Sequence, residues 1–268
     1  MSFSIQGKTA IITGAATGIG HAIARHFLDE GANVVFSDMN EKRLKANCDD
    51  LAAQENCRLF VGDLREKLAV ANLLSTALDA FDRVDILVNA TRSFGVTDML
   101  DPTDTSVETL LDQNLNVALR TSQAVARRMI LQAEQEDEKP QSAGAIINIS
   151  SIAAHRTQPE LLGFSISNAA LEQMTRSMGV ALAPHGIRVN AVAVGSLMSG
   201  TLRDIIAENP EYRDAIIQGT PLHRIGTASE VAELAQFLSS SASAFMTGQI
   251  VTLDGGRSVL DTVQRAAH

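Results

Sequence analysis

The chain has 268 residues, of which 45% are hydrophobic and 20% charged, with a formal net charge of −9. This composition supports one α/β domain with a large core, and the negative charge argues against nucleic acid or an anionic membrane as a partner. No apolar run approaches the ~18 residues of a membrane-spanning helix. Because the only cysteines are Cys48 and Cys57 and no basic, apolar leader precedes the first strand, we expect a soluble cytoplasmic protein.

The first motif is a glycine-rich turn between a strand and a helix. An apolar strand at residues 9–12 runs into Thr-Gly-Ala-Ala-Thr-Gly-Ile-Gly at residues 13–20, and apolar residues at helical spacing follow. Such a turn presents backbone N–H groups and a helix dipole to a dinucleotide pyrophosphate. The alternative is a tight turn that binds nothing. The predicted site residues are Gly14, Thr17, Gly18, Ile19 and Gly20.

A second apolar strand, at residues 32–37, ends at Asp38. An acidic side chain at this distance from the glycines accepts hydrogen bonds from the adenosine ribose hydroxyls and repels a 2′-phosphate. Because Ala15 and Ala16 offer no cation to offset Asp38, the sequence favours NAD over NADP. The alternative is that Asp38 only forms the turn at the strand end.

Further apolar segments alternate with amphipathic helical stretches along the rest of the chain. Together with the first two strands they make seven, and such repetition requires a parallel sheet with helices on both faces. The sequence therefore predicts a single-domain doubly wound Rossmann fold over residues 1–268, with ligands at the carboxyl ends of the strands. The five additional strands are expected at residues 58–62, 84–89, 145–150, 187–192 and 249–253.

Over nearly its whole length the chain resembles the short-chain dehydrogenase/reductase family, including its 3-oxoacyl-thioester reductases. The resemblance rests on the turn at 13–20, Asp63-Leu64, Asn89-Ala90, Asn114, and segments 148–151, 187–190 and 253–256, all in family order. It implies hydride transfer between a nicotinamide and a carbonyl or alcohol carbon. It also implies that Asp63 bonds the adenine edge beside Leu64, that Asn89 and Ala90 line the adenosine ribose, and that Gly195 and Ser199 contact the nicotinamide.

The resemblance also exposes two missing catalytic side chains. Family members use a Tyr as proton donor, a Lys one helical turn later, a Ser that polarises the carbonyl and an Asn that supports a water. Ser151 and Asn114 match the last two, but Phe164 stands at the Tyr position and Asn168 at the Lys position. A positioned general acid contributes about 10² to 10⁴ in rate, so we expect impaired or altered activity.

No neighbouring residue is an evident replacement for the lost groups. Every lysine precedes the predicted active-site helix, and the single tyrosine, Tyr212, lies in residues 196–219, which the resemblance identifies as a substrate lid. His155 is a candidate proton donor, with an ordinary hydrogen-bonded loop residue as the alternative. Arg92 replaces a family glycine beside the cofactor, and the sequence assigns it no role.

Two functions follow from these observations. The first is an NAD(H)-binding oxidoreductase with weakened chemistry that acts on a small carbonyl or alcohol with Ser151, Asn114, water or His155. The alternative is a non-catalytic NAD sensor or scaffold, that is, a pseudoenzyme, which could pair with an active relative. The resemblance further implies a homotetramer assembled through helices at about residues 104–129 and 164–183.

Overall fold

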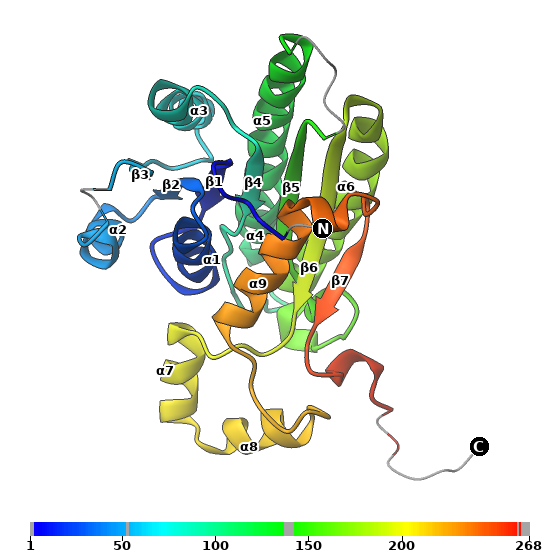
Figure 1. Cartoon of the computed structure of the whole chain (residues 1–268). Helices are drawn as coiled ribbons and strands as arrows, with labels where there is room; N and C mark the ends of the chain where they lie inside the picture. Colours follow the sequence, from blue (N-terminus) through cyan, green and yellow to red (C-terminus); the bar gives the residue numbers. More distant parts are fainter. Residues whose placement is uncertain (1–2, 52–53, 137–141, 262, 264–268) are drawn as a thin grey trace.

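The computed structural model describes residues 3–51, 54–136, 142–261 and 263. Within these residues seven parallel strands form one sheet in the order β3-β2-β1-β4-β5-β6-β7 (Figure 1). Each strand lies within two residues of its predicted bounds, so the predicted doubly wound α/β fold is confirmed. The strands are β1 (Thr9–Thr13), β2 (Asn33–Asp38), β3 (Cys57–Val61), β4 (Ile86–Asn89), β5 (Gly144–Ser151), β6 (Ile187–Val194) and β7 (Ile250–Leu253).

Helices cover both faces of this sheet. One core layer joins α1, α2 and α9 to side chains from one face of the strands, and the other joins α3, α5 and α6 to the opposite face. The helices are α1 (Gly18–Asp29), α2 (Glu41–Cys48), α3 (Lys67–Phe81), α4 (Ser106–Leu111), α5 (Val117–Glu134), α6 (Leu162–Leu182), α7 (Gly200–Glu208), α8 (Glu211–Gln218) and α9 (Ala228–Ser239). No helix of the described residues is long and apolar enough to cross a membrane.

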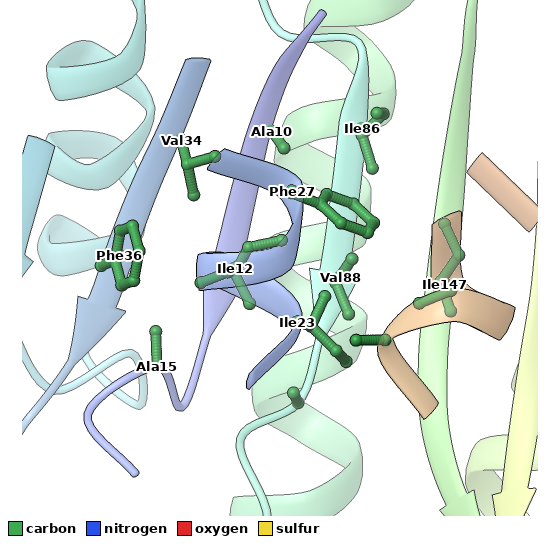
Figure 2. Packing of buried hydrophobic residues seen from close by; sticks show 14 of the residues in the cluster. Ala10, Ile12, Ala15, Ile23, Phe27, Val34, Phe36, Ile86, Val88 and Ile147 are labelled. Atoms are coloured by element: carbon green, nitrogen blue, oxygen red, sulfur yellow. The ribbon is translucent and has the colours of Figure 1, made fainter. Parts of the chain in front are cut away.

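Alternation along the central strands explains why both faces are apolar. Ile11 of β1 packs in the layer of α3 and α5, whereas Ile12 packs under α1, because successive side chains of a strand point to opposite faces. Figure 2 shows Ile23 and Phe27 of α1 beside Ile12 and Val88 of the sheet. The sheet is therefore covered on both sides, and its strand ends are left as the place for a ligand.

The helix expected at about residues 104–129 is interrupted. A π-helical turn, η1 (Asp112–Asn116), separates α4 from α5. Such turns insert an extra residue into a helix and are frequent at functional sites. Here the turn contains Asn114. The helix expected at 164–183 corresponds to the uninterrupted α6.

The segment after β6 projects beyond the carboxyl ends of the strands. It contains α7 and α8, which Figure 1 shows near the arrowhead ends of β6 and β7. The structure therefore brings residues 196–219 to the edge of the sheet where the glycine turn also lies.

Candidate functional site

A cleft of about 1560 Å³ lies at the carboxyl ends of the strands. Its walls come from the β1–α1 turn, the ends of β4, β5 and β6, and α7 and α8. The predicted site residues that line it are Gly14, Thr17, Gly18, Ile19, Gly20, Asp38, Asp63, Leu64, Ala90, Ser151, Phe164, Gly195 and Ser199. The predicted residues outside this lining are Asn89, Asn114 and Asn168.

The glycine turn brings two backbone segments into close contact. Gly14 has a φ of +66°, and a Cβ there would lie 2.7 Å from the carbonyl oxygen of Ala90. Helix α1 begins directly after Thr17, whose side chain makes no capping hydrogen bond. An uncapped helix start facing a cleft suits a phosphate, since free N–H groups and the helix dipole both favour negative charge.

Asp38 fastens the same turn from the end of β2. Its Oδ2 accepts a hydrogen bond from the Ala16 N–H at 3.1 Å, and its Oδ1 accepts one from the Asn40 N–H at 2.8 Å. An ionised carboxylate has about four acceptor sites, so lone pairs remain for ribose hydroxyls. The turn-forming role and the ribose-binding role of Asp38 are therefore compatible.

Asp63 is engaged by a residue that the sequence did not single out. The Arg65 guanidinium donates to Asp63 through Nη2 at 2.6 Å and Nε at 3.0 Å, and this hydrogen bonding lowers the pKa of Asp63. Arg65 also lines the cleft. The only signal in the sequence for this ion pair is that Asp63 and Arg65 are two residues apart.

These features fit a dinucleotide at the adenosine end of the cleft. The close approach at Gly14 leaves backbone rather than side chain beside the turn, the start of α1 is uncapped, and the Asp38 carboxylate keeps lone pairs. Each matches one part of the ligand: the turn and helix suit the pyrophosphate and the carboxylate suits the ribose.

Ser151 ends β5 and is almost completely buried, with 5% of its surface exposed. Its Oγ accepts a hydrogen bond from the Ala153 N–H at 3.2 Å, so the hydroxyl proton is left to donate. Because Ser151 lines the cleft, its O–H can be offered to an oxygen atom of a ligand.

Asn114 fastens the loop after β4 to α6. Its Oδ1 accepts from the Ser93 N–H at 2.7 Å, while its Nδ2 donates to the Ser93 carbonyl at 3.0 Å and to Ser167 Oγ at 3.1 Å. Ser167 Oγ in turn donates to the carbonyl of Phe164 at 3.0 Å. Since Ser93 directly follows Arg92, the buried Asn114 side chain fixes the backbone beside Arg92.

Phe164 forms the centre of an aromatic and cationic cluster. The Arg92 guanidinium carbon lies 4.9 Å from the centroid of the Phe164 ring, and Phe94 packs edge-on at 5.3 Å. Arg92, Phe94 and Phe164 all line the cleft. The sequence marked Arg92 and Phe164 as departures from the family pattern, but it gave no sign that the two are in contact, and it did not single out Phe94.

Asn168 and Asn89 are turned into the protein. Asn168 is 1% exposed, and its Nδ2 donates to the Phe164 carbonyl within α6 at 2.8 Å. Asn89 Nδ2 donates to Ser122 Oγ at 2.9 Å and to Asn148 Oδ1 at 2.8 Å. The Asn168 amide is therefore bonded within α6 and the Asn89 amide to neighbouring elements, and neither side chain lines the cleft. Of the Asn89-Ala90 pair, only Ala90 lines it.

His155, the candidate proton donor, and Tyr212, the single tyrosine of the chain, lie in different surroundings. His155 is outside the cleft lining, with its Nε2 at 2.8 Å from Oε2 of the buried Glu172, whose Oε1 accepts from Ser150 Oγ at 2.9 Å. Burial raises the pKa of Glu172. Tyr212 on α8 is about half exposed and lines the cleft. The structure therefore brings Tyr212, and not His155, to the same cleft as Ser151.

Comparisons with known proteins agree with this geometry. A family model described as enoyl-(acyl carrier protein) reductase matches residues 14–258. The oxidoreductase UcpA of Escherichia coli is 31% identical over 266 residues, covering 97% of both chains. The 7alpha-hydroxysteroid dehydrogenase of Escherichia coli is 32% identical over 256 residues, covering 94% of both.

A solved structure supports the same assignment. A 7alpha-hydroxysteroid dehydrogenase complexed with NADH and 7-oxo glycochenodeoxycholic acid superimposes with a TM-score of 0.85 at 31% identity, covering 95% of both chains. Sequence similarity and fold similarity thus extend over the same nearly complete length. The chain therefore belongs to the short-chain dehydrogenase/reductase family, whose members are nicotinamide-dependent oxidoreductases.

Proposed function

We propose that the chain binds NAD(H) in the cleft and that its hydride-transfer activity is weak because Phe164 and Asn168 occupy the positions of the family's Tyr and Lys. The observation that carries this proposal is the Phe164 ring in the cleft wall, which has no proton to give. Among the described lining residues there is no lysine, and the one tyrosine is Tyr212. A missing general acid costs about 10² to 10⁴ in rate.

Apart from Tyr212, the remaining residues bind and orient rather than transfer protons. The glycine turn and Asp38 hold the adenosine end, and Ser151 donates its O–H to the substrate oxygen, which it polarises. NAD(H), when bound, supplies or accepts the hydride. The proton for a product alkoxide then comes from water or from Tyr212. Proximity and the Ser151 hydrogen bond support slow turnover, because orientation survives the loss of one catalytic group.

Asp38 supports a preference for NAD over NADP. Its carboxylate would face the 2′-phosphate of NADP, and the nearby Arg65 is already paired with Asp63. We therefore expect NADPH to bind at least about tenfold more weakly than NADH, a difference of about 1.4 kcal/mol. Fluorescence titration of both cofactors tests this, and Asp38→Asn should narrow the gap.

The same family membership suggests the arrangement of the whole protein. We propose one domain with residues 196–219 as a lid over the cleft, a cytoplasmic location, and a homotetramer that pairs α6 with its copy. Exposed apolar side chains on α6 support the pairing, since Ile166 is 41% and Val180 76% exposed. Light scattering on the purified protein tests the assembly.

The test of the catalytic proposal is a restoration experiment. Turnover of a panel of ketones and aldehydes with NADH is compared between the native protein, Phe164→Tyr with Asn168→Lys, and the same pair with Arg92→Gly. The structure calls for the third change because Arg92 lies over the ring that would become Tyr. We expect the triple variant to gain about 10² or more over the native protein.

Three results have different meanings in this experiment. Native turnover at ordinary enzyme rates would contradict the proposal. NADH binding with no native turnover on any substrate would instead favour the second candidate, a non-catalytic NAD-binding sensor or scaffold. The specific observation in favour of that candidate is the Arg92–Phe164 contact, which places a bulky cation at the reacting end of the cleft. Failure to bind NADH would refute both.

A further inference from the structure

Arg92 is a cation inside the cleft without a counter-ion among the residues that the structure describes. It is half-buried, and no described residue forms a hydrogen bond or an ion pair with its guanidinium. The guanidinium carbon instead lies 4.9 Å from the centroid of the Phe164 ring. Desolvation alone lowers the pKa of Arg92 to about 10, which leaves it charged at neutral pH. A desolvated and unpaired charge is costly, so such a site favours an anionic partner.

The backbone that carries Arg92 is anchored on both sides. On one side the Thr13 hydroxyl accepts hydrogen bonds from the N–H groups of Ala90 and Thr91, both at 3.1 Å. On the other side the Asn114 amide accepts a hydrogen bond from the Ser93 N–H and donates one to the Ser93 carbonyl. A side chain mounted on a fixed loop loses little further freedom when it binds, which is the arrangement of a recognition residue.

The contact with the Phe164 ring uses none of the hydrogen bonds that the Arg92 guanidinium can donate to an oxygen acceptor. A guanidinium that lies against an aromatic face keeps N–H groups around its edge, where they match the two oxygens of a carboxylate. Phe94 and Phe164 provide an apolar surface beside this edge. The combination suits a ligand with an apolar body and a terminal carboxylate.

The cofactor phosphates have a separate set of donors. The glycine turn touches the first residues of the loop after β4, since a Cβ on Gly14 would lie 2.9 Å from Thr91 Cα, but the Arg92 guanidinium lies over the Phe164 ring of α6. The reacting end of the cleft is the side of Ser151 and Phe164. An anion bound by Arg92 therefore belongs to the molecule that reacts there.

We propose that Arg92 is the specificity-determining residue of the cleft and binds a carboxylate of the substrate, so that the substrate class is oxo- or hydroxy-carboxylic acids. This inference rests on the proposed function, since it identifies the substrate class of the same site. Asn114 acts as a positioning residue by fixing Ser93 next to Arg92.

The test compares matched ligands by binding rather than turnover. Levulinate, phenylpyruvate and longer oxo-carboxylates are each paired with the corresponding primary amide and titrated by calorimetry, with and without saturating NADH. We expect the best carboxylate to bind about tenfold or more tightly than its amide. Arg92→Gln should abolish this preference, and Arg92→Lys should keep only part of it, because Lys retains the charge without the planar fork.

Arg156→Gln is the matched control, because Arg156 is an exposed arginine of the same cleft lining. It should keep the carboxylate preference and the NADH affinity. Equal binding of carboxylates and amides by the native protein would overturn the inference, as would a preference that survives Arg92→Gln or disappears in Arg156→Gln. A loss of NADH affinity in Arg92→Gln without change in the carboxylate preference would overturn it too, and would assign Arg92 to a cofactor phosphate.

The two proposals fail separately. If the native protein does not bind NADH, the proposed function is refuted, whereas the titrations without NADH still decide whether Arg92 selects carboxylates. Thermal unfolding of each variant shows whether the loop after β4 remains folded.

Discussion

The contact between Arg92 and Phe164 can be measured as a coupling energy. The guanidinium carbon lies 4.9 Å from the ring centroid, within the ~6 Å range of a cation–π interaction, and both side chains are at least half-buried. Such pairs contribute about 0.5–1 kcal/mol when exposed and about 2 kcal/mol when desolvated. Because desolvation dominates the surroundings of Arg92, we expect a coupling energy of about 1–2 kcal/mol.

The assay is a double-mutant cycle in equilibrium unfolding by urea. The native protein, Arg92→Gln, Phe164→Leu and the double variant are compared at one fixed protein concentration, because an oligomer's stability depends on concentration. A second cycle on Arg58 and Phe81, a cation–π pair at 5.3 Å with an exposed arginine, provides the comparison. It should give a smaller coupling.

The cycle isolates the pair because each single change removes the charge or the aromatic ring, and the cost of lost packing cancels between the two sides of the cycle. A coupling energy indistinguishable from zero for Arg92 and Phe164 would refute the reasoning. The guanidinium would then be only adjacent to the ring, and its orientation toward a ligand carboxylate would lose its physical basis.

Three further predictions concern other parts of the chain. Burial raises the pKa of Glu172, so the folded state binds more protons than the unfolded state above pH ~4.5. The free energy of unfolding of the native protein should therefore fall as pH rises, relative to that of Glu172→Gln. Urea midpoints of the two proteins that move in parallel with pH would contradict this. Gly14→Ala should lower the free energy of unfolding by about 1–3 kcal/mol and weaken NADH binding in fluorescence titrations, because its Cβ meets the Ala90 carbonyl at a positive φ; unchanged values would contradict the close approach. Burial raises the pKa of Cys48 and Cys57 from 9.0 to about 11. The rate at which Ellman's reagent labels these thiols in the folded protein should therefore be about 100-fold lower than for an ordinary thiol. In denaturant, labelling should be fast.

The sequence predicted the centre of the sheet well because the inner strands are buried on both faces, whereas the edge strands β3 and β7 are only partly buried. Continuous apolar runs such as the one that ends at Ile12 have no competing amphipathic pattern, and each is bounded by a turn residue such as Gly14 or Asp38. Two features therefore coincide at these strand ends, and across the sheet the expected bounds differ from the observed ones by at most two residues.

The interruption at η1 could not be predicted in the same way. Residues on both sides of Asn114 continue a helical pattern of apolar side chains, so periodicity alone indicates one helix. The extra residue of the π turn is stabilised by tertiary hydrogen bonds, since the Asn114 amide binds Ser93 from the loop after β4 and Ser167 from α6. Local sequence contains neither partner.

The contact of Arg92 with Phe164 is likewise a product of the fold. The two residues are far apart in the sequence, and the adjacency of β4 and β5 brings the loop after β4 and the start of α6 to one cleft. The sequence could mark each as unusual for the family, but it could not show that they interact. Their pairing turns two separate departures into one local rearrangement.

Electrostatic repulsion can explain this rearrangement on the proposed alignment, which puts Phe164 at the family's Tyr position and Asn168 at its Lys position. A Lys at position 168 and an Arg at position 92 would place two cations around the residue at 164, since Asn168 bonds the Phe164 carbonyl and Arg92 covers its ring. In a desolvated cleft two like charges repel strongly. On that alignment, the replacement of Lys by Asn and of Gly by Arg would keep one positive charge near residue 164, on the Arg92 side chain in the cleft wall. If the carboxylate titrations support the role proposed for Arg92, the loss of the Tyr and Lys and the gain of a carboxylate site would be two aspects of one change.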